Sequence, residues 1–206
     1  MLTIEELMTI SPVIPVIVID DIDDAVPLAK ALVNAGLKVL EITLRTDCGL
    51  AAISKIKNEV PDAIVGAGTV VTVDDLQQSI AAGSQFIVSP GTTAALVDAA
   101  LEQSIPLLPG VVTPTEAMAM LSKGIRYMKF FPAQAAGGIP MLKSIAGPLP
   151  QIKFCPTGGV TADNASDFLA LDNVLCVGGT WMLSKQDIAA KNWAAIELKA
   201  QAAAAL

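Results

Sequence analysis

The feature that most constrains the fold is a repeat, because short aliphatic runs alternate with longer amphipathic stretches along the chain. Each cycle takes roughly 20–25 residues, which is the spacing expected of consecutive βα units. The aliphatic runs span residues 13–19, 38–44, 63–70, 85–90, 106–112, 127–132, 153–158 and 173–180. Eight such units predict an α/β fold that closes into a (β/α)8, or TIM, barrel, with an open doubly wound sheet as the alternative.

The composition agrees with strands that are buried on both faces. Hydrophobic residues make up 53% of the chain but aromatic residues only 4%, so aliphatic side chains must form the core. Neither a linker nor a change of composition interrupts the chain, so we expect one barrel domain over residues 1–206 with a short N-terminal helix. Since no apolar run approaches about 18 residues, we expect no membrane partner. The run at residues 13–19 predicts a strand and not a signal peptide.

Charge, cysteine and histidine content exclude several classes of function. The net charge of −7 and the lack of a basic stripe argue against a nucleic-acid partner. Cys48, Cys155 and Cys176 are an odd number without metal-like spacing, which predicts reduced thiols and a cytoplasmic protein. The absence of histidine excludes histidine metal ligands and histidine bases, so proton transfer must use other groups. We expect no metal and no cofactor.

A lysine, Lys129, stands in the middle of the run at residues 127–132, which reads as a short buried strand closed by proline. Lysine is rarely buried without a purpose, because an unpaired ammonium in an apolar site costs several kcal/mol. A dry pocket favours the neutral amine, which can attack a carbonyl group. On this stretch alone, an edge-strand lysine that points at solvent is an equally good interpretation.

The run at residues 38–44 and the residue after it carry a polar face. Side chains alternate along a strand, so Glu41, Thr43 and Arg45 share one face and the aliphatic residues between them share the other. In an isolated antiparallel sheet this face would point at solvent. Inside eight βα repeats both faces of a strand are covered, so the polar face is expected to point into the barrel and serve the function.

Other strand ends add candidates at the same mouth of the barrel. By alternation, Phe131 shares a face with Lys129. Gly66 and Gly68 precede Thr69, and we expect these glycines to let a ligand approach the backbone. The last two strands end in Thr157-Gly158-Gly159 and Gly178-Gly179-Thr180, a pattern typical of the barrel phosphate site.

Together these residues predict a mechanism. A buried amine, a carboxylate and a guanidinium converge at one barrel mouth, where Arg45 can hold a substrate carboxylate and the glycine pairs a phosphate. An amine and a carbonyl form an imine, whose protonated form is an electron sink, and Glu41 is the proton shuttle. The residues therefore indicate a metal-free Schiff-base lyase that acts on a small phosphorylated keto acid.

Five motifs resemble those of the 2-keto-3-deoxy-6-phosphogluconate (KDPG) aldolases and 4-hydroxy-2-oxoglutarate aldolases, and the likeness extends from about residue 12 to residue 181. They are Glu41-Ile42-Thr43-Leu44-Arg45-Thr46, Val65-Gly66-Ala67-Gly68-Thr69, Ser89-Pro90-Gly91, Lys129-Phe130-Phe131-Pro132-Ala133 and Phe154-Cys155-Pro156-Thr157-Gly158-Gly159. The resemblance implies a (β/α)8 barrel, a homotrimer and a place in the Entner–Doudoroff pathway. It implies an imine between Lys129 and the C2 ketone, with Glu41 as the general acid and base, partly through water.

The resemblance also implies binding roles. Pyruvate would be bound by Arg45 and Thr69 at its carboxylate, with Pro90 and Phe131 packing around it. The substrate hydroxyls would lie near Thr157, and the phosphate would be held by Gly158, Gly159, Gly179 and Thr180. Thr180 departs from the family pattern, because serine is expected there, although a hydroxyl is kept.

Several alternatives stay open at this stage. The resemblance also implies cleavage of 4-hydroxy-2-oxoglutarate to pyruvate and glyoxylate, and it leaves open a preference for the galactonate epimer of the substrate. A phosphosugar isomerase or epimerase on the same barrel would use the phosphate site but has no need of Lys129. A non-catalytic phosphate-binding barrel would leave Glu41 and Lys129 without a purpose.

Overall fold

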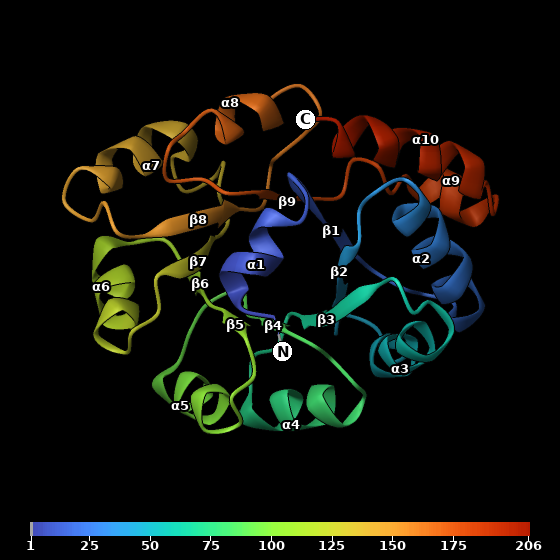
Figure 1. Cartoon of the computed structure of the whole chain (residues 1–206), viewed down its shortest axis with the longest axis horizontal. Helices are drawn as coiled ribbons and strands as arrows, with labels where there is room; N and C mark the ends of the chain where they lie inside the picture. Colours follow the sequence, from blue (N-terminus) through green and yellow to red (C-terminus); the bar gives the residue numbers. More distant parts are fainter. Residues whose placement is uncertain (1) are drawn as a thin grey trace.

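The computed structural model describes residues 2–206 and contains parallel strands surrounded by helices (Figure 1). The strands are β1 (Val13–Ile17), β2 (Val39–Thr43), β3 (Ile64–Gly68), β4 (Ile87–Val88), β5 (Leu107–Leu108), β6 (Gly110–Val111), β7 (Tyr127–Phe130), β8 (Lys153–Pro156) and β9 (Val177–Gly179). The helices are α1 (Ile4–Thr9), η1 (Ile22–Asp24), α2 (Ala25–Asn34), α3 (Gly49–Glu59), α4 (Val73–Ala81), α5 (Ala94–Glu102), α6 (Pro114–Ser122), α7 (Gly138–Ala146), α8 (Ala165–Leu169), α9 (Lys185–Ala189) and α10 (Trp193–Ala204). None of these helices is long and apolar enough to cross a membrane.

The strands form two parallel sheets that close into one ring. Their orders are β5-β4-β3-β2-β1-β9 and β6-β7-β8. The fifth aliphatic run gives both β5 and β6, because Pro109 between them has no backbone N–H to donate. On the other side, isolated parallel bridges join Phe154 to Val174 and Thr157 to Gly178, which links β8 to the β9 segment. The ring confirms the predicted (β/α)8 barrel and excludes the open sheet.

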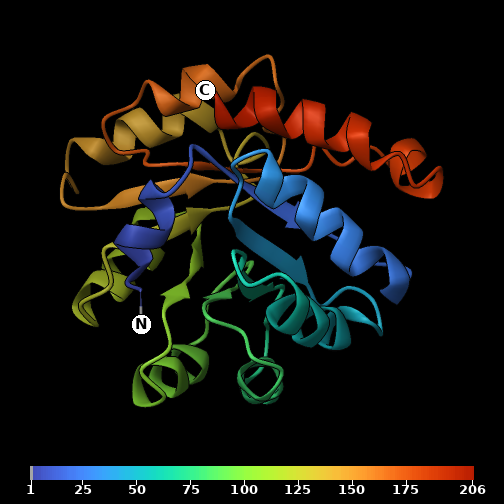
Figure 2. The ribbon, with the colours of Figure 1, turned by 45° about the vertical axis from the view of Figure 1, so that its right-hand side comes forward.

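Side-chain alternation decides what faces the inside of the barrel. In β2, Leu40 and Ile42 join the large outer core beneath the helices, whereas Val39 joins the inner cluster. Glu41 and Thr43 follow Val39 on the inward face and are buried. The predicted inward direction of this polar face is therefore correct. The helices cover the outer faces, and α10 packs along α2 (Figure 2).

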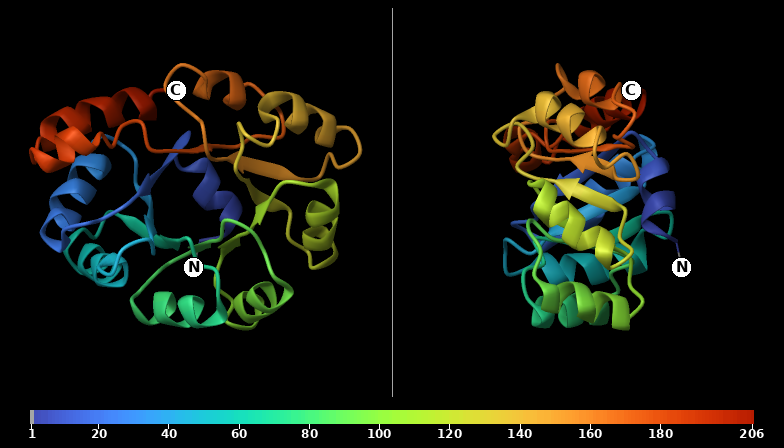
Figure 3. Two further views of the ribbon diagram at one scale, coloured as in Figure 1. Left: turned by 180° about the vertical axis from the view of Figure 1, so that it is seen from behind. Right: turned by 90° about the vertical axis from the view of Figure 1, so that its left-hand side faces the viewer.

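The short helix α1 lies at one end of the barrel (Figure 3). Thr3 and Glu6 form a capping box that satisfies the first backbone N–H groups of this helix. Leu7 and Met8 are buried in the inner apolar cluster, which they share with residues near the beginnings of several strands. The hydrogen bond from Tyr127, at the start of β7, to Glu5 raises the pKa of the tyrosine, with burial as a second cause. Helix α1 therefore closes the amino end of the barrel, and the carboxyl end stays open for a site.

Candidate active site

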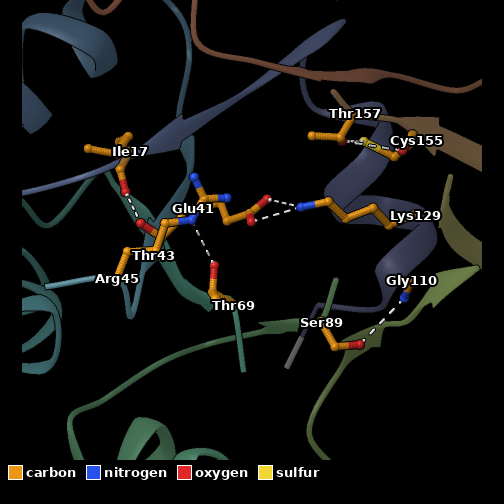
Figure 4. Close-up of polar contacts among 10 residues, drawn as sticks. All are labelled: Ile17, Glu41, Thr43, Arg45, Thr69, Ser89, Gly110, Lys129, Cys155 and Thr157. Carbon is orange, nitrogen blue, oxygen red and sulfur yellow. Dashed lines mark hydrogen bonds and ion pairs between the residues drawn. The ribbon is translucent and has the colours of Figure 1, made fainter. Parts of the chain in front are cut away.

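Lys129 and Glu41 meet inside the carboxyl half of the barrel (Figure 4). The Nζ atom of Lys129 donates to Oε1 of Glu41 at 3.0 Å, and its distance to Oε2 is 3.4 Å. The two residues are only 4% and 3% exposed, so the pair is shielded from water. Lys129 stands in register with Gly110 on one side and Cys155 on the other. β7 is therefore an inner strand of its sheet, and the interpretation of Lys129 as a solvent-facing edge lysine is excluded.

The glycines of β3 make room for side chains of the protein itself. A Cβ atom on Gly68 would lie 2.3 Å from Oε1 of Glu41, and one on Gly66 would lie 2.5 Å from the ring of Phe86. Real Cβ atoms do not approach other atoms this closely, so each glycine is needed for its neighbour. We expected these glycines to admit a ligand to the backbone. The structure instead gives the space above Gly68 to the carboxylate of Glu41.

Arg45 and Thr69 lie together where β2 and β3 end. The Nε atom of Arg45 donates to Oγ1 of Thr69 at 3.3 Å, which leaves the terminal nitrogens of the guanidinium to other partners (Figure 4). Thr69 has a φ of 61°, a left-handed conformation that is unusual for a β-branched residue. Such strain is found where the surrounding structure holds a side chain in a required direction, here toward Arg45.

Phe131 borders the buried amine, and Pro90 lies beside Gly110, the register neighbour of Lys129. The ring centroid of Phe131 lies 5.4 Å from Nζ of Lys129, as the alternation along β7 predicts. Pro90 follows β4 and approaches Gly110 closely, since a Cβ on Gly110 would lie 2.3 Å from the Pro90 carbonyl group. Both residues are half-buried and apolar. Phe131 therefore gives the amine an apolar neighbour that adds no charge.

The glycine-rich turn after β8 and the glycine pair at the end of β9 are neighbours. Thr157 and Gly178 form a parallel bridge, and a Cβ on Gly178 would lie 2.2 Å from Oγ1 of Thr157. Gly158 and Gly159 have φ values of 98° and 77°, which only glycine adopts readily. Thr180 follows β9 and is exposed. The structure therefore places the predicted phosphate residues side by side at the carboxyl mouth.

Sequence reasoning missed two residues that pack against these glycines. The indole of Trp181 covers Gly179, where a Cβ would lie 1.9 Å from a ring atom. The side chain of Gln134 lies against Gly159, where a Cβ would be 2.5 Å from Cβ of Gln134. The sequence offered one signal for them, which is closeness to residues already predicted for the site. Trp181 directly follows Thr180, and Gln134 lies shortly after β7, the strand that carries Lys129.

The floor beneath Lys129 is neutral. Cys155, its register neighbour, is buried beside Cys176. Hydrogen bonding to Cys155 and then burial raise the pKa of the Cys176 thiol well above its ordinary value, so the thiol stays uncharged. Within residues 2–206, no group of three or more histidine, cysteine, aspartate or glutamate side chains is arranged to hold a metal ion. The acid–base chemistry available beside the amine is that of Glu41.

An amine held against a carboxylate inside a (β/α)8 barrel, with a guanidinium nearby, is the arrangement of a lysine-dependent barrel aldolase. The model of the KDPG and KHG aldolase family matches residues 4–198. The chain therefore belongs to the KDPG and KHG aldolase family, and it is a carbon–carbon lyase.

Relatives and solved structures support this assignment over nearly the whole chain. The 2-dehydro-3-deoxy-phosphogluconate aldolase of Dickeya dadantii (strain 3937) is 54% identical over 179 residues, 87% of this chain and 84% of that relative. A KDPG aldolase of Legionella pneumophila, with pyruvate captured as a covalent carbinolamine, is 47% identical with a TM-score of 0.95 and covers 97% of each chain. The enzyme of Zymomonas mobilis ZM4, with 3-phosphoglycerate, is 48% identical with a TM-score of 0.92 and covers 98% of this chain and 94% of its own.

Proposed function

We propose that the chain cleaves KDPG to pyruvate and glyceraldehyde 3-phosphate through an imine on Lys129. The observation that carries this proposal is the contact of 3.0 Å between the buried Lys129 amine and the carboxylate of Glu41. The carboxylate can take a proton from the ammonium, and the free amine then attacks the C2 ketone of the substrate. Glu41 then returns this proton to the carbinolamine hydroxyl, which leaves as water, so that a protonated imine and the Glu41 carboxylate remain. No metal and no cofactor take part in this mechanism.

Glu41 moves the protons in the steps that follow. Its carboxylate, directly or through one water, removes the proton of the C4 hydroxyl while the C3–C4 bond breaks. The electron pair of that bond enters the imine, which becomes an enamine, and glyceraldehyde 3-phosphate leaves. The protonated Glu41 then returns a proton to C3, and hydrolysis of the imine releases pyruvate. A single carboxylate serves every transfer because it lies beside the nitrogen that carries the substrate.

The binding roles follow the positions of the remaining residues. Arg45 and Thr69 hold the carboxylate of the pyruvate half, because a guanidinium and a hydroxyl are suitable donors for it. Pro90 and Phe131 pack around that half. Thr157 lies near the substrate hydroxyls. The phosphate is held by Gly158, Gly159, Gly179 and Thr180, and glycine-rich turns suit it because their N–H groups are accessible. The pyruvate and phosphoglycerate in the solved relatives support both halves of this assignment.

We propose further that the chain is one barrel domain over residues 1–206, assembles as a homotrimer and works in the cytoplasm within the Entner–Doudoroff pathway. Activity on 4-hydroxy-2-oxoglutarate is expected as well, because the pyruvate half of that substrate uses the same residues. A KHG/KDPG aldolase of Escherichia coli (strain K12), 51% identical over 179 residues, supports this expectation. Parallel assays on KDPG, its galactonate epimer and 4-hydroxy-2-oxoglutarate rank the three substrates.

Borohydride reduction in the presence of pyruvate, followed by mass spectrometry, tests the proposal. We expect one reduced adduct on the wild type, mapping to Lys129, and none on Lys129→Ala. Lys143→Ala is the matched control, since Lys143 is an exposed lysine on α7 and its loss should leave the adduct in place. A wild type without an adduct would contradict the aldolase mechanism and favour an isomerase or a non-catalytic phosphate-binding barrel.

A further inference from the structure

The loop between β2 and α3, which carries Arg45, is fastened to the segment that follows β1 by side chains that the mechanism does not use. Oγ1 of Thr46 donates to the carbonyl oxygen of Ile19 at 2.5 Å. The thiol of Cys48 donates to the same carbonyl oxygen at 2.8 Å. Two donors from one short loop therefore converge on a single backbone acceptor in the loop after β1.

These bonds lie where the backbone pairing of the two strands has ended. The β1–β2 register runs from Val16↔Glu41 to Ile17↔Ile42. At the next position the buried hydroxyl of Thr43 donates to the Ile17 carbonyl oxygen at 2.9 Å (Figure 4). Beyond Thr43 the loop has left the ladder, so side-chain donors supply the connection to β1 that backbone groups supply lower in the barrel.

Arg45 stands between two supports. On the β3 side, its Nε atom reaches Oγ1 of Thr69 at 3.3 Å. On the β1 side, the residue that follows it, Thr46, is bonded to Ile19. Arg45 is exposed, and an exposed arginine has many rotamers to lose when it binds a ligand. The bond of Thr46 holds the backbone next to Arg45, and the bond to Thr69 holds its guanidinium. Both therefore reduce the conformational entropy that Arg45 loses when a ligand binds.

We propose that Thr46 is a positioning residue, which orients the guanidinium of Arg45 toward the substrate carboxylate by tying the Arg45 loop to the Ile19 carbonyl. The proposal rests on the proposed function, in which Arg45 binds that carboxylate. Thr46 acts through Arg45, so it sets how tightly the pyruvate half binds. It leaves the chemistry at Lys129 unchanged once the site is full.

The test is a pyruvate titration of borohydride trapping. Thr46→Val removes the hydroxyl and keeps the shape, and it should raise the half-saturating pyruvate concentration about 5-fold, the worth of one hydrogen bond. The adduct formed at saturating pyruvate should equal that of the wild type. Thr46→Ser should restore the wild-type titration. Ser54→Ala is the matched control, because it removes a hydroxyl bond of 2.9 Å to the Ala82 carbonyl, between the outer helix α3 and the end of α4.

A double variant separates positioning from a general loss of structure. In an Arg45→Ala background, Thr46→Val should add no further change, because the group through which it acts is gone. The inference is overturned if Thr46→Val has the half-saturating pyruvate concentration of the wild type. It is also overturned if Thr46→Val causes the same shift in the Arg45→Ala background, or if Ser54→Ala shifts this concentration equally. In each case the adduct on the wild type still upholds the proposed function. If Thr46→Val does not fold, Cys48→Ala removes the second donor to Ile19 and carries the same prediction at a smaller size.

Discussion

The two ends of the barrel are built from the same strands and filled with opposite chemistry. At the amino end, Leu7 and Met8 of α1 pack into an apolar cluster with residues such as Phe86. At the carboxyl end, the space is occupied by the ion pair of Lys129 and Glu41. Apolar burial stabilises a fold, whereas burying two charges costs desolvation energy that their attraction offsets only in part. The amino end therefore stabilises the fold, whereas the buried charges at the carboxyl end lower its stability.

Strand β3 shows that one device serves both ends. Gly66 leaves room for the ring of Phe86, and two residues later Gly68 leaves room for the carboxylate of Glu41. Both glycines lie on the inward face, because they are two positions apart. In each layer of the barrel, a large inward side chain thus fits because the neighbouring strand has a glycine, which has no side chain, beside it. The identity of the admitted side chain decides whether the layer is core or site.

The largest expected effect comes from breaking the ion pair. Lys129→Met should lower kcat/KM for KDPG cleavage by at least about 10⁴-fold, because no other group can form the imine. It should also lower the free energy of unfolding by about 3–5 kcal/mol, because Glu41 is left buried without a partner. Steady-state kinetics and urea denaturation measure the two changes.

The double variant Lys129→Met with Glu41→Gln sharpens this prediction. Removing the second charge should recover most of the lost stability and none of the activity. Equal free energies of unfolding for Lys129→Met and the wild type would contradict the view that an unpaired buried charge at the carboxyl end is destabilising.

The next effect comes from filling the space that Glu41 occupies. Gly68→Ala places a methyl group where the carboxylate lies, so Glu41 must turn away from Lys129. We expect kcat to fall by about 10²-fold or more, which is the usual worth of a positioned acid–base group. Gly91→Ala is the control, because a Cβ on Gly91 meets nothing within 4 Å. A wild-type kcat in Gly68→Ala would show that catalysis does not depend on the direct contact between Glu41 and Lys129.

The sequence was sufficient for the periodic features of the molecule. Eight aliphatic runs at regular spacing predicted the barrel, since only strand and helix periods were needed. Alternation along β2 predicted that Glu41 faces inward, and the unusual position of Lys129 within an apolar run pointed to the partner strand. These two residues are 88 positions apart, and the barrel topology is what justified placing them at one mouth.

Features that depend on local packing were beyond the sequence. Nothing in the pattern indicated that Gly68 accommodates Glu41 and not a ligand, because a glycine does not reveal which neighbour fills its space. The interruption at Pro109 was read as part of one strand. Trp181 and Gln134 were missed because their role is steric contact with glycine turns, which leaves no periodic signal.

At the amino end, the expected effect is on stability alone. Met8 is 1% exposed, so Met8→Ala should leave a cavity and lower the free energy of unfolding by about 2–5 kcal/mol. The kcat of the folded variant should stay within about 2-fold of the wild type, because Met8 lies in the apolar layer away from Lys129. Met118→Ala is the control, since Met118 is 58% exposed on α6 and its truncation leaves no cavity. A large loss of kcat in Met8→Ala would show that the two ends are coupled.

The smallest expected effect tests whether the carboxyl end has stabilising contacts of its own. Glu116, in the first turn of α6, accepts from the backbone N–H groups of Thr113 and Val112 at 2.7 and 2.8 Å. These bonds lower the pKa of Glu116 below its ordinary value of 4.5, and the bond to Thr113 has the larger effect. A carboxylate whose pKa is lowered by folding stabilises the protein above that ordinary value, and the contribution is lost as the pH falls through the folded pKa.

Glu116→Gln should therefore lower the free energy of unfolding at pH 7 by about 0.5–1 kcal/mol, a small value because the group is exposed to solvent. The difference between variant and wild type should shrink as the pH is lowered from 5 toward 3, where the wild-type carboxyl is protonated as well. Denaturant titrations at several pH values measure it. Glu102→Gln, at the carboxyl end of α5 and outside any capping box, is the control. A difference that stayed constant with pH would mean that shape, and not the charge of the cap, holds this helix at the mouth of the site.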